Sequence, residues 1–186
     1  METQKIKIAV VVLNWNGKAW LEKFLPNLIK HSLEATVFIA DNASTDDSID
    51  FVKNNFPNVK IIINVTNGGY AKGYNDALKK IDAEYFVLLN SDIQVTESWI
   101  SPIIDLMDSD KKIAACQPKL LDYKKRNTFE YAGASGGFID ILGYPFCRGR
   151  IFDDLEKDKG QYNDAIEVFW ASGACLFVRV SHFYEI

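Results

Sequence analysis

The stretch that decides the fold is Ile6–Leu13, which reads Ile-Lys-Ile-Ala-Val-Val-Val-Leu. Lys7 is its only polar residue. A strand with one face in water alternates polar and apolar residues, whereas a strand covered on both faces is a continuous apolar run. The stretch therefore predicts a buried strand of a parallel sheet.

The residues that follow this run change their spacing. After a polar turn at residues 14–17, apolar side chains recur at helical intervals between residues 20 and 29. Pro26 falls inside this segment, so the helix either bends or restarts there. A strand followed by a helix is the repeating unit of α/β proteins.

The same unit recurs along the chain. Ser44 is expected to cap a helix that ends before Pro57. Further helices are expected at 71–80 and 99–107, and strands at 35–40, 59–63, 85–89 and 113–117. The pattern predicts an α/β fold in which a Rossmann-like, mostly parallel sheet is flanked by helices and joined by right-handed crossovers.

The second part of the chain has a different character. Residues 118–166 are rich in glycine, charge and aromatics, which favours short strands and a long loop. Two more strands, at 167–170 and 174–180, are expected to flank a turn at 171–173. We interpret residues 1–186 as a single domain, with a ligand-binding half at 1–117 and a second half at 118–186.

Composition excludes several classes of protein. The 186 residues are 48% hydrophobic and carry a net charge of −4, as in a soluble globular protein without the basic field of a nucleic-acid binder. The three cysteines have no metal-site spacing, which favours free thiols in a reducing compartment. No apolar run approaches the length of a spanning helix, roughly 20 residues. We expect a cytoplasmic protein, and the sequence leaves open a peripheral contact with the inner face of a membrane.

Polar residues follow each of the first four predicted strands. They are Asn14, Asp41, Asn64 or Asn67, and the run Asn90-Ser91-Asp92. Because parallel strands end at one edge of a sheet, these groups should gather where open α/β sheets bind ligands. Asp92 suits Mg2+ or Mn2+, which prefer oxygen ligands, although a carboxylate here can also cap the next turn.

Five segments of the chain resemble family 2 glycosyltransferases of the GT-A fold, and most closely their rhamnosyltransferase-like branch. These segments are Val11–Gly17, Ala40–Asp46, Asn67–Asn75, Leu88–Asp92 and Trp170–Leu176. They follow one another in the family's order and span almost the whole chain. The resemblance implies an inverting transfer of a sugar from a nucleotide diphosphate sugar to a hydroxyl acceptor in cell-surface polysaccharide synthesis.

The resemblance also implies roles for individual residues. Asp41 would contact the nucleotide base or ribose, and Asn14 and Asn16 would line the nucleoside pocket. The loop that contains Asn67, Gly68, Gly73 and Asn75 would form the floor beneath the nucleoside and its phosphates. Asn90 and Ser91 would lie beside the donor, in a position where the family has a first carboxylate, and Asp92 would bind the metal. Trp170, Ser172 and Gly173 would lie near the sugar and the acceptor.

The donor implied by the resemblance is a UDP- or dTDP-sugar, bound with Mg2+ or Mn2+, and the acceptor is a saccharide or a lipid-linked saccharide. The family's catalytic base lies in a later block, so we expect it beyond Ile186, in which case the chain is a trimmed piece. Two alternatives stay open. One is a fragment that binds nucleotide sugar without catalysis, and the other is a sugar nucleotidyltransferase, although a single Lys18 after the first strand is thin support for it.

Overall fold

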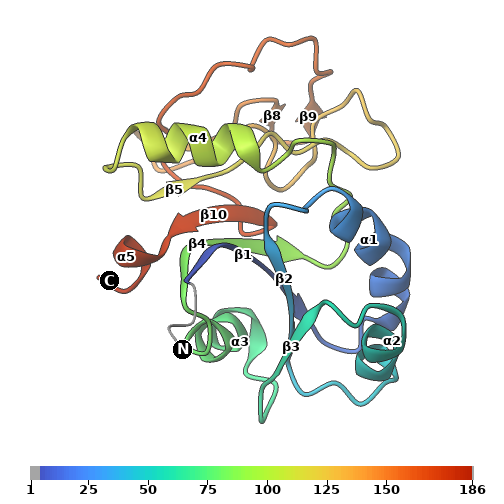
Figure 1. The fold of residues 1–186 in the computed structure, drawn as a ribbon. Coiled ribbons are helices and arrows are strands. Elements are labelled where there is room, and N and C mark those ends of the chain that lie inside the picture. Colours follow the sequence, from blue (N-terminus) through green and yellow to red (C-terminus); the bar gives the residue numbers. More distant parts are fainter. Residues whose placement is uncertain (1–4, 186) are drawn as a thin grey trace.

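The computed structural model describes residues 5–185. A six-stranded sheet with the order β3-β2-β1-β4-β10-β5 forms its centre (Figure 1). The strands β1 (Ile6–Asn14), β2 (Thr36–Asp41), β3 (Lys60–Ile63) and β4 (Ala83–Asn90) are parallel. β10 (Cys175–Arg179) runs antiparallel between β4 and β5 (Ala115–Cys116). The predicted α/β class with a mostly parallel sheet is confirmed.

Helices cover both faces of this sheet. α1 (Lys18–Lys30), α2 (Ser48–Asn55) and α4 (Ser101–Ser109) pack on the face to which Val10 and Val12 point. α3 (Gly69–Leu78) and the short α5 (Val180–Phe183) pack on the other face, against Ala9 and Val11. The side chains of residues 9–12 in β1 are all at most 2% exposed. Burial on both faces is the physical reason for the continuous apolar run.

A small antiparallel sheet lies in the second half of the chain. It contains β6 (Gly137–Ile139), β7 (Pro145–Cys147), β8 (Arg150–Ile151) and β9 (Asp154–Leu155), each paired with the next. Phe129, Ala134 and Cys147 form a separate small core beneath it. The short strands expected between residues 118 and 166 are therefore present.

One strand prediction was wrong, and another strand is shorter than predicted. Residues 167–170 form no strand, and only Trp170 makes an isolated bridge, to Gly137. Glu167 and Phe169 are exposed, and the backbone hydrogen bonds of Phe169 and Trp170 go to Gly137 alone, so the segment makes one bridge and no ladder. The strand expected at 113–117 is reduced to β5, because β10 offers it only Phe177 and Val178 as partners.

Two local predictions on helices also need correction. α2 begins at Ser48 and not after Ser44, whose hydroxyl instead donates to Asp41 Oδ1 at 2.5 Å. The helix does not restart at Pro26, because α1 continues through that residue to Lys30. A proline ring is tolerated there on the exposed side of the helix.

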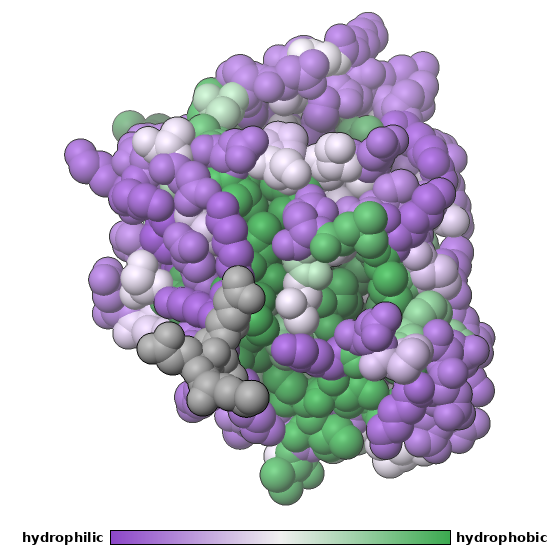
Figure 2. All heavy atoms as spheres, viewed as in Figure 1, coloured by the Kyte–Doolittle hydropathy of each residue, from purple (hydrophilic) through white to green (hydrophobic). Residues whose placement is uncertain are grey.

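The surface is mainly hydrophilic, with a band of hydrophobic residues open to view at the centre of the face in Figure 2. Within residues 5–185, no helix has the length and apolar character needed to cross a membrane.

Candidate functional site

The polar residues at the strand ends lie side by side, as the parallel-sheet rule predicts. Asn14 is in register with Asp41 across β1 and β2, and Asn90 is opposite Leu13 across β4 and β1. The amide of Asn64 donates to Asp41 O at 2.8 Å. These polar groups therefore lie together at one edge of the sheet.

A buried network joins Asn14 to Asp41. Asn14 Nδ2 lies 3.0 Å from Asp41 Oδ1, 3.1 Å from Ser44 Oγ and 2.9 Å from Ser48 Oγ. The amide of Ser44 donates to Asp41 Oδ2 at 2.9 Å. Asn14 is 1% exposed and Asp41 2% exposed, and both carboxylate oxygens of Asp41 already accept hydrogen bonds. Asp41 thus holds the loop after β2 in shape from beneath.

A second set of contacts ties the loop after β1 to the loop after β2. Asn16 has a positive φ of 49°, and its Oδ1 accepts from the amide of Thr45 at 2.7 Å. Asp46 accepts from the amides of Lys18 and Ser48, so it caps α1 and α2 together. Burial opposes ionisation of Asp46, but the hydrogen bonds from Ser48 and Lys18 outweigh it and lower the pKa of this carboxyl. The two loops therefore form one rigid rim.

Steric crowding in this rim explains why residue 17 is a glycine. A Cβ at residue 17 would meet Asn14 Oδ1 at 2.4 Å, a separation that real Cβ atoms do not show. That oxygen is buried and has no hydrogen-bond partner among the described residues. The close approach of the backbone to Asn14 thus requires a residue without a side chain.

Three asparagine amides connect the loop after β3 to the rim. Asn64 Nδ2 donates to Asn42 Oδ1 at 3.3 Å and to Gly73 O at 2.9 Å. Asn42 Nδ2 donates to Asn67 Oδ1 at 2.7 Å. A Cβ on Gly73 would lie 3.0 Å from the Asn42 amide, so Gly73 lets α3 approach this chain of amides closely.

Two other residues predicted in this loop stand apart from the network. Gly68 is exposed, and a Cβ there would meet the side chain of Lys72 at 2.5–2.9 Å. Asn75 is exposed on α3. Both residues are therefore open to solvent, and their predicted place beneath the donor stays a prediction.

The turn Asn90-Ser91-Asp92 follows β4 directly. The amide of Asn90 donates to Ala174 O at 2.9 Å, which attaches this turn to the segment before β10. Asp92 is exposed and makes no ion pair with the residues that the structure describes. Its carboxylate is therefore free to take a cation from solvent.

The residues here fit a metal held jointly with a ligand. No group of three or more metal-ligating His, Cys, Asp or Glu side chains occurs within residues 5–185. Mg2+ is commonly bound through one or two carboxylates together with substrate phosphates, so one free carboxylate at the edge is a sufficient protein contribution. Asp92, which follows Asn90 and Ser91 in the same turn, supplies the hard oxygen chemistry that such ions prefer.

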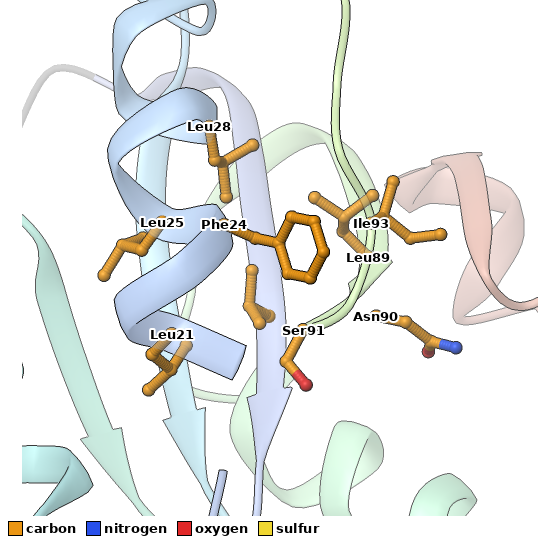
Figure 3. A pocket seen from close by; sticks show the side chains of 9 residues that line it. Leu21, Phe24, Leu25, Leu28, Leu89, Asn90, Ser91 and Ile93 are labelled. Carbon is orange, nitrogen blue, oxygen red and sulfur yellow. The ribbon is translucent and has the colours of Figure 1, made fainter. Parts of the chain in front are cut away.

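Beneath this turn lies a very small apolar cavity of about 10 Å3 (Figure 3). Its lining comes from α1, from Val12 of β1, from the end of β4 and from Ile93, with Asn90 and Ser91 at one end. A cavity of this size holds one water at most, so it is not the ligand site. A much wider depression, lined by Lys30, His31 and Glu97 among others, lies beside the far end of α1.

The segment that precedes β10 is held by side chains that sequence analysis did not single out. Gln117 Oε1 accepts from the amide of Ser172 at 2.6 Å, and Gln117 Nε2 donates to Gly133 O at 2.8 Å. The hydroxyl of Tyr70, from the first turn of α3, donates to Gly173 O at 2.6 Å. Ser172 and Gly173 thereby come next to the loop after β3 and to Asn90.

Trp170 lies differently from its neighbours. A Cβ on Gly137 would fall inside its ring, at 1.8 Å from Cε2, so the indole packs flat on β6. Its Nε1 points to Phe138 O at 3.4 Å. The structure thus places Trp170 in the packing of the small sheet.

Comparison with known proteins finds one matching family model and several related proteins. The family model described as Glycosyl transferase family 2 matches residues 9–186. An N-acetylglucosaminyl-diphospho-decaprenol L-rhamnosyltransferase of Mycobacterium tuberculosis is 25% identical over 198 residues, which cover 96% of this chain and 63% of that protein. The poly(ribitol-phosphate) beta-N-acetylglucosaminyltransferase TarS of Staphylococcus aureus is 28% identical over 109 residues, or 55% of this chain and 19% of that one. The chain therefore spans less than two thirds of the length of these relatives.

Solved structures agree on the fold. S. aureus TarS 1-349 in complex with UDP-GlcNAc superposes with a TM-score of 0.53 at 23% identity, covering 62% of this chain and 34% of that one. The mannosyltransferase PcManGT from Pyrobaculum calidifontis in complex with GDP-Man and Mn2+ gives a TM-score of 0.54 at 20% identity, covering 63% and 36%. The predicted GT-A-type architecture is confirmed, and the chain belongs to glycosyl transferase family 2.

Proposed function

We propose that this chain binds a nucleotide diphosphate sugar and belongs to an enzyme that transfers the sugar, with inversion, to a saccharide or lipid-linked saccharide acceptor. The observation that carries the proposal is the alignment of Asn14, Asp41 and Asn90 at one edge of the parallel sheet. Ligands of open α/β sheets bind at this edge. The relatives' printed names, which include a decaprenol-linked substrate, support a role in cell-surface polysaccharide synthesis.

The nucleoside would lie against the rim built from the loops after β1 and β2. Asn16 and the backbone of residues 43–46 are the exposed or half-buried parts of this rim, whereas Asp41 supports it from below. The donor is a UDP- or dTDP-sugar in this proposal. One of the solved structures that the fold matches holds UDP-GlcNAc.

Asp92 would hold Mg2+ or Mn2+ at the diphosphate. The ion supplies charge neutralisation to the leaving nucleoside diphosphate. A solved structure with the same fold contains Mn2+ with GDP-mannose. An inverting transfer also needs a base that accepts the proton of the acceptor hydroxyl, and we assign that role to no residue within 5–185.

The site would operate in the cytoplasm, at the inner face of a membrane where a lipid-linked acceptor is available. Gln117 and Tyr70 would then set the position of Ser172 and Gly173 relative to the donor. In this proposal the acceptor side of the site lies next to the turn that would hold the metal, and the hydrogen bond from the amide of Asn90 to Ala174 O supports this.

The test is a thermal-shift panel of UDP, dTDP, GDP and CDP, each with and without Mn2+, on the wild type and on Asp92→Ala. A ligand at about 100 times its dissociation constant adds roughly 2.7 kcal/mol. For a domain of this size that corresponds to a rise in Tm of about 5–10 °C. We expect one nucleotide to raise the Tm in a metal-dependent way, and Asp92→Ala to abolish this rise. The control is Asp105→Ala, which changes an exposed carboxylate on α4 and should behave as the wild type.

The outcomes separate the alternatives. Nucleotide binding without sugar transfer by a full-length protein indicates a binding module. Release of pyrophosphate from a nucleoside triphosphate and a sugar phosphate indicates a nucleotidyltransferase. No shift with any nucleotide contradicts the donor site.

A further inference from the structure

A basic and aromatic patch joins α1 to the loop after β5. It consists of Trp20 and Lys23 on α1 and of residues 121–126, Leu-Asp-Tyr-Lys-Lys-Arg, in the loop. The Lys23 ammonium lies 4.4 Å from the centre of the Tyr123 ring and 5.9 Å from that of Trp20. Figure 1 shows this loop, in yellow, close to α1. The two segments, about a hundred residues apart, thus form one surface.

The aromatic rings of the patch are packed into a fixed arrangement. Phe24, buried in α1, contacts Trp20 in a stacked geometry at 6.1 Å and Tyr123 edge-on at 5.3 Å. Trp20 is still 48% exposed and Tyr123 43% exposed. Both side chains therefore stay partly accessible to solvent while their contacts with the buried Phe24 hold them in place.

The patch is positively charged, in contrast to the chain as a whole. Lys23, Lys124, Lys125 and Arg126 are exposed, and none of them makes an ion pair within residues 5–185. The nearby carboxylate of Asp122 accepts hydrogen bonds from the backbone amides of Lys124 and Lys125, so it points toward the backbone of its own loop. Four cations thus share one surface on a protein of net charge −4.

The patch borders the candidate site. Arg126 Nη2 donates to Gln94 Oε1 at 2.6 Å, and Gln94 is two residues beyond Asp92. A surface bound to this patch would therefore lie beside the metal-binding turn.

We propose that this basic and aromatic patch docks on an anionic lipid bilayer. Lysine and arginine clusters are attracted to anionic headgroups, and tryptophan and tyrosine are the side chains that favour the interface between headgroups and acyl chains. A nucleic acid is disfavoured as the occupant, since the rest of the chain supplies no basic field. The inference goes beyond the proposed function and is testable without donor or acceptor.

The experiment is flotation of the 186-residue chain with vesicles of phosphatidylcholine alone or mixed with phosphatidylglycerol, at low and high salt. We expect binding only to the mixed vesicles and its loss at high salt. Each basic residue near an anionic surface contributes about 1 kcal/mol, a factor of about five. The triple variant Lys124→Ala, Lys125→Ala, Arg126→Ala should therefore reduce the partition constant roughly 100-fold.

The matched control changes the net charge equally at three other places. Lys53, Lys79 and Lys112 are exposed and lie on or beside α2, α3 and β5. Their triple alanine variant should bind within a few-fold of the wild type, and the Tm of both triple variants should stay close to that of the wild type. Equal losses in the two variants would mean that net charge, and not this patch, drives binding, which overturns the proposal.

A second comparison distinguishes a bilayer from an anionic polymer. Trp20→Ala should weaken binding to mixed vesicles while leaving retention on dextran sulfate unchanged. If Trp20→Ala binds vesicles as the wild type does, or if the wild type fails to float with mixed vesicles, the membrane assignment is wrong. None of these outcomes depends on whether the protein transfers a sugar.

Discussion

The hydroxyl of Tyr70 donates a 2.6 Å hydrogen bond to the carbonyl oxygen of Gly173, which lies 103 residues further along the chain. The Tyr70 ring also packs edge-on against Tyr74, whose buried hydroxyl donates to Leu89 O at 3.1 Å. One contact thus fixes the segment before β10 relative to the loop after β3 and to the end of β4. A side chain at residue 173 would collide with this hydroxyl, because its Cβ would lie 2.6 Å from it.

Tyr70→Phe should disturb the position of Ser172 and Gly173 without disturbing nucleotide binding. The variant removes one oxygen and keeps the ring on Tyr74. We expect faster amide exchange at residues 172–174, an acceptor KM raised several-fold and an unchanged Kd for the nucleotide. Tyr162→Phe, which removes a similar hydroxyl contact to Glu156 in the other half of the chain, is the control.

A double-variant cycle checks the same contact. Gly173→Ala should be damaging in the wild type and clearly less damaging in Tyr70→Phe, because the hydroxyl oxygen at 2.6 Å is then gone and only the ring carbon at 3.2 Å remains close. Additive effects of the two changes would contradict a direct coupling between these residues.

Asp41→Ala should lower stability and nucleotide affinity together. It leaves the amide and the hydroxyl of Ser44 without their acceptor and removes one of the three acceptors of the buried Asn14 amide, and an unsatisfied buried donor costs about 1–3 kcal/mol. Chemical denaturation measures the loss. Asp47→Ala is the matched control, since its carboxylate is 82% exposed and contributes only a surface ion pair with Lys18.

Gly73→Ala should destabilise the fold although alanine is the better helix former. The added Cβ would lie 3.0 Å from both the Asn42 amide and Leu13, and these neighbours are part of the packed network. We expect a lower Tm and weaker nucleotide binding. Gly68→Ala is the contrasting variant: its Cβ would meet the Lys72 side chain at 2.5–2.9 Å, so Tm should fall here too, but the Asn42 network is untouched and nucleotide binding should change less than in Gly73→Ala.

A separate polar network at the opposite end of β4 predicts a pH dependence. The hydroxyl of Tyr85 donates to Asp108 Oδ1 at 2.6 Å and accepts from the buried Arg179 at 2.7 Å. The hydrogen bonds from Tyr85 and Lys7 lower the pKa of Asp108 to about 2. The ionised Asp108 carboxylate therefore makes its full contribution to the free energy of unfolding above the ordinary carboxyl pKa of 3.8. This contribution is lost as the pH falls toward 2.

Asp108→Asn tests this linkage. The stability difference between the wild type and the variant should be constant from pH 7 to pH 5 and shrink between pH 4 and pH 2. Urea denaturation at each pH measures it. A difference that does not change across that range would show that Asp108 titrates normally in the folded protein.

The sequence determined the sheet and the edge at which its polar strand ends lie together. A run buried on both faces can belong only to a covered strand, and parallel strands end together, so the alignment of Asn14, Asp41 and Asn90 followed from local patterns. The individual roles of the site residues in binding stay predictions, since contacts within the protein do not report contacts with a ligand.

The tertiary structure decided the contacts between distant side chains. The sequence around Ser44 equally suits a helix cap, yet its hydroxyl is used by Asp41, because the buried carboxylate has a greater need for a donor. The bonds of Tyr70 to Gly173 and of Gln117 to Ser172 join residues 103 and 55 positions apart. No periodicity encodes such pairs: they depend on how helices and loops pack once the sheet has formed.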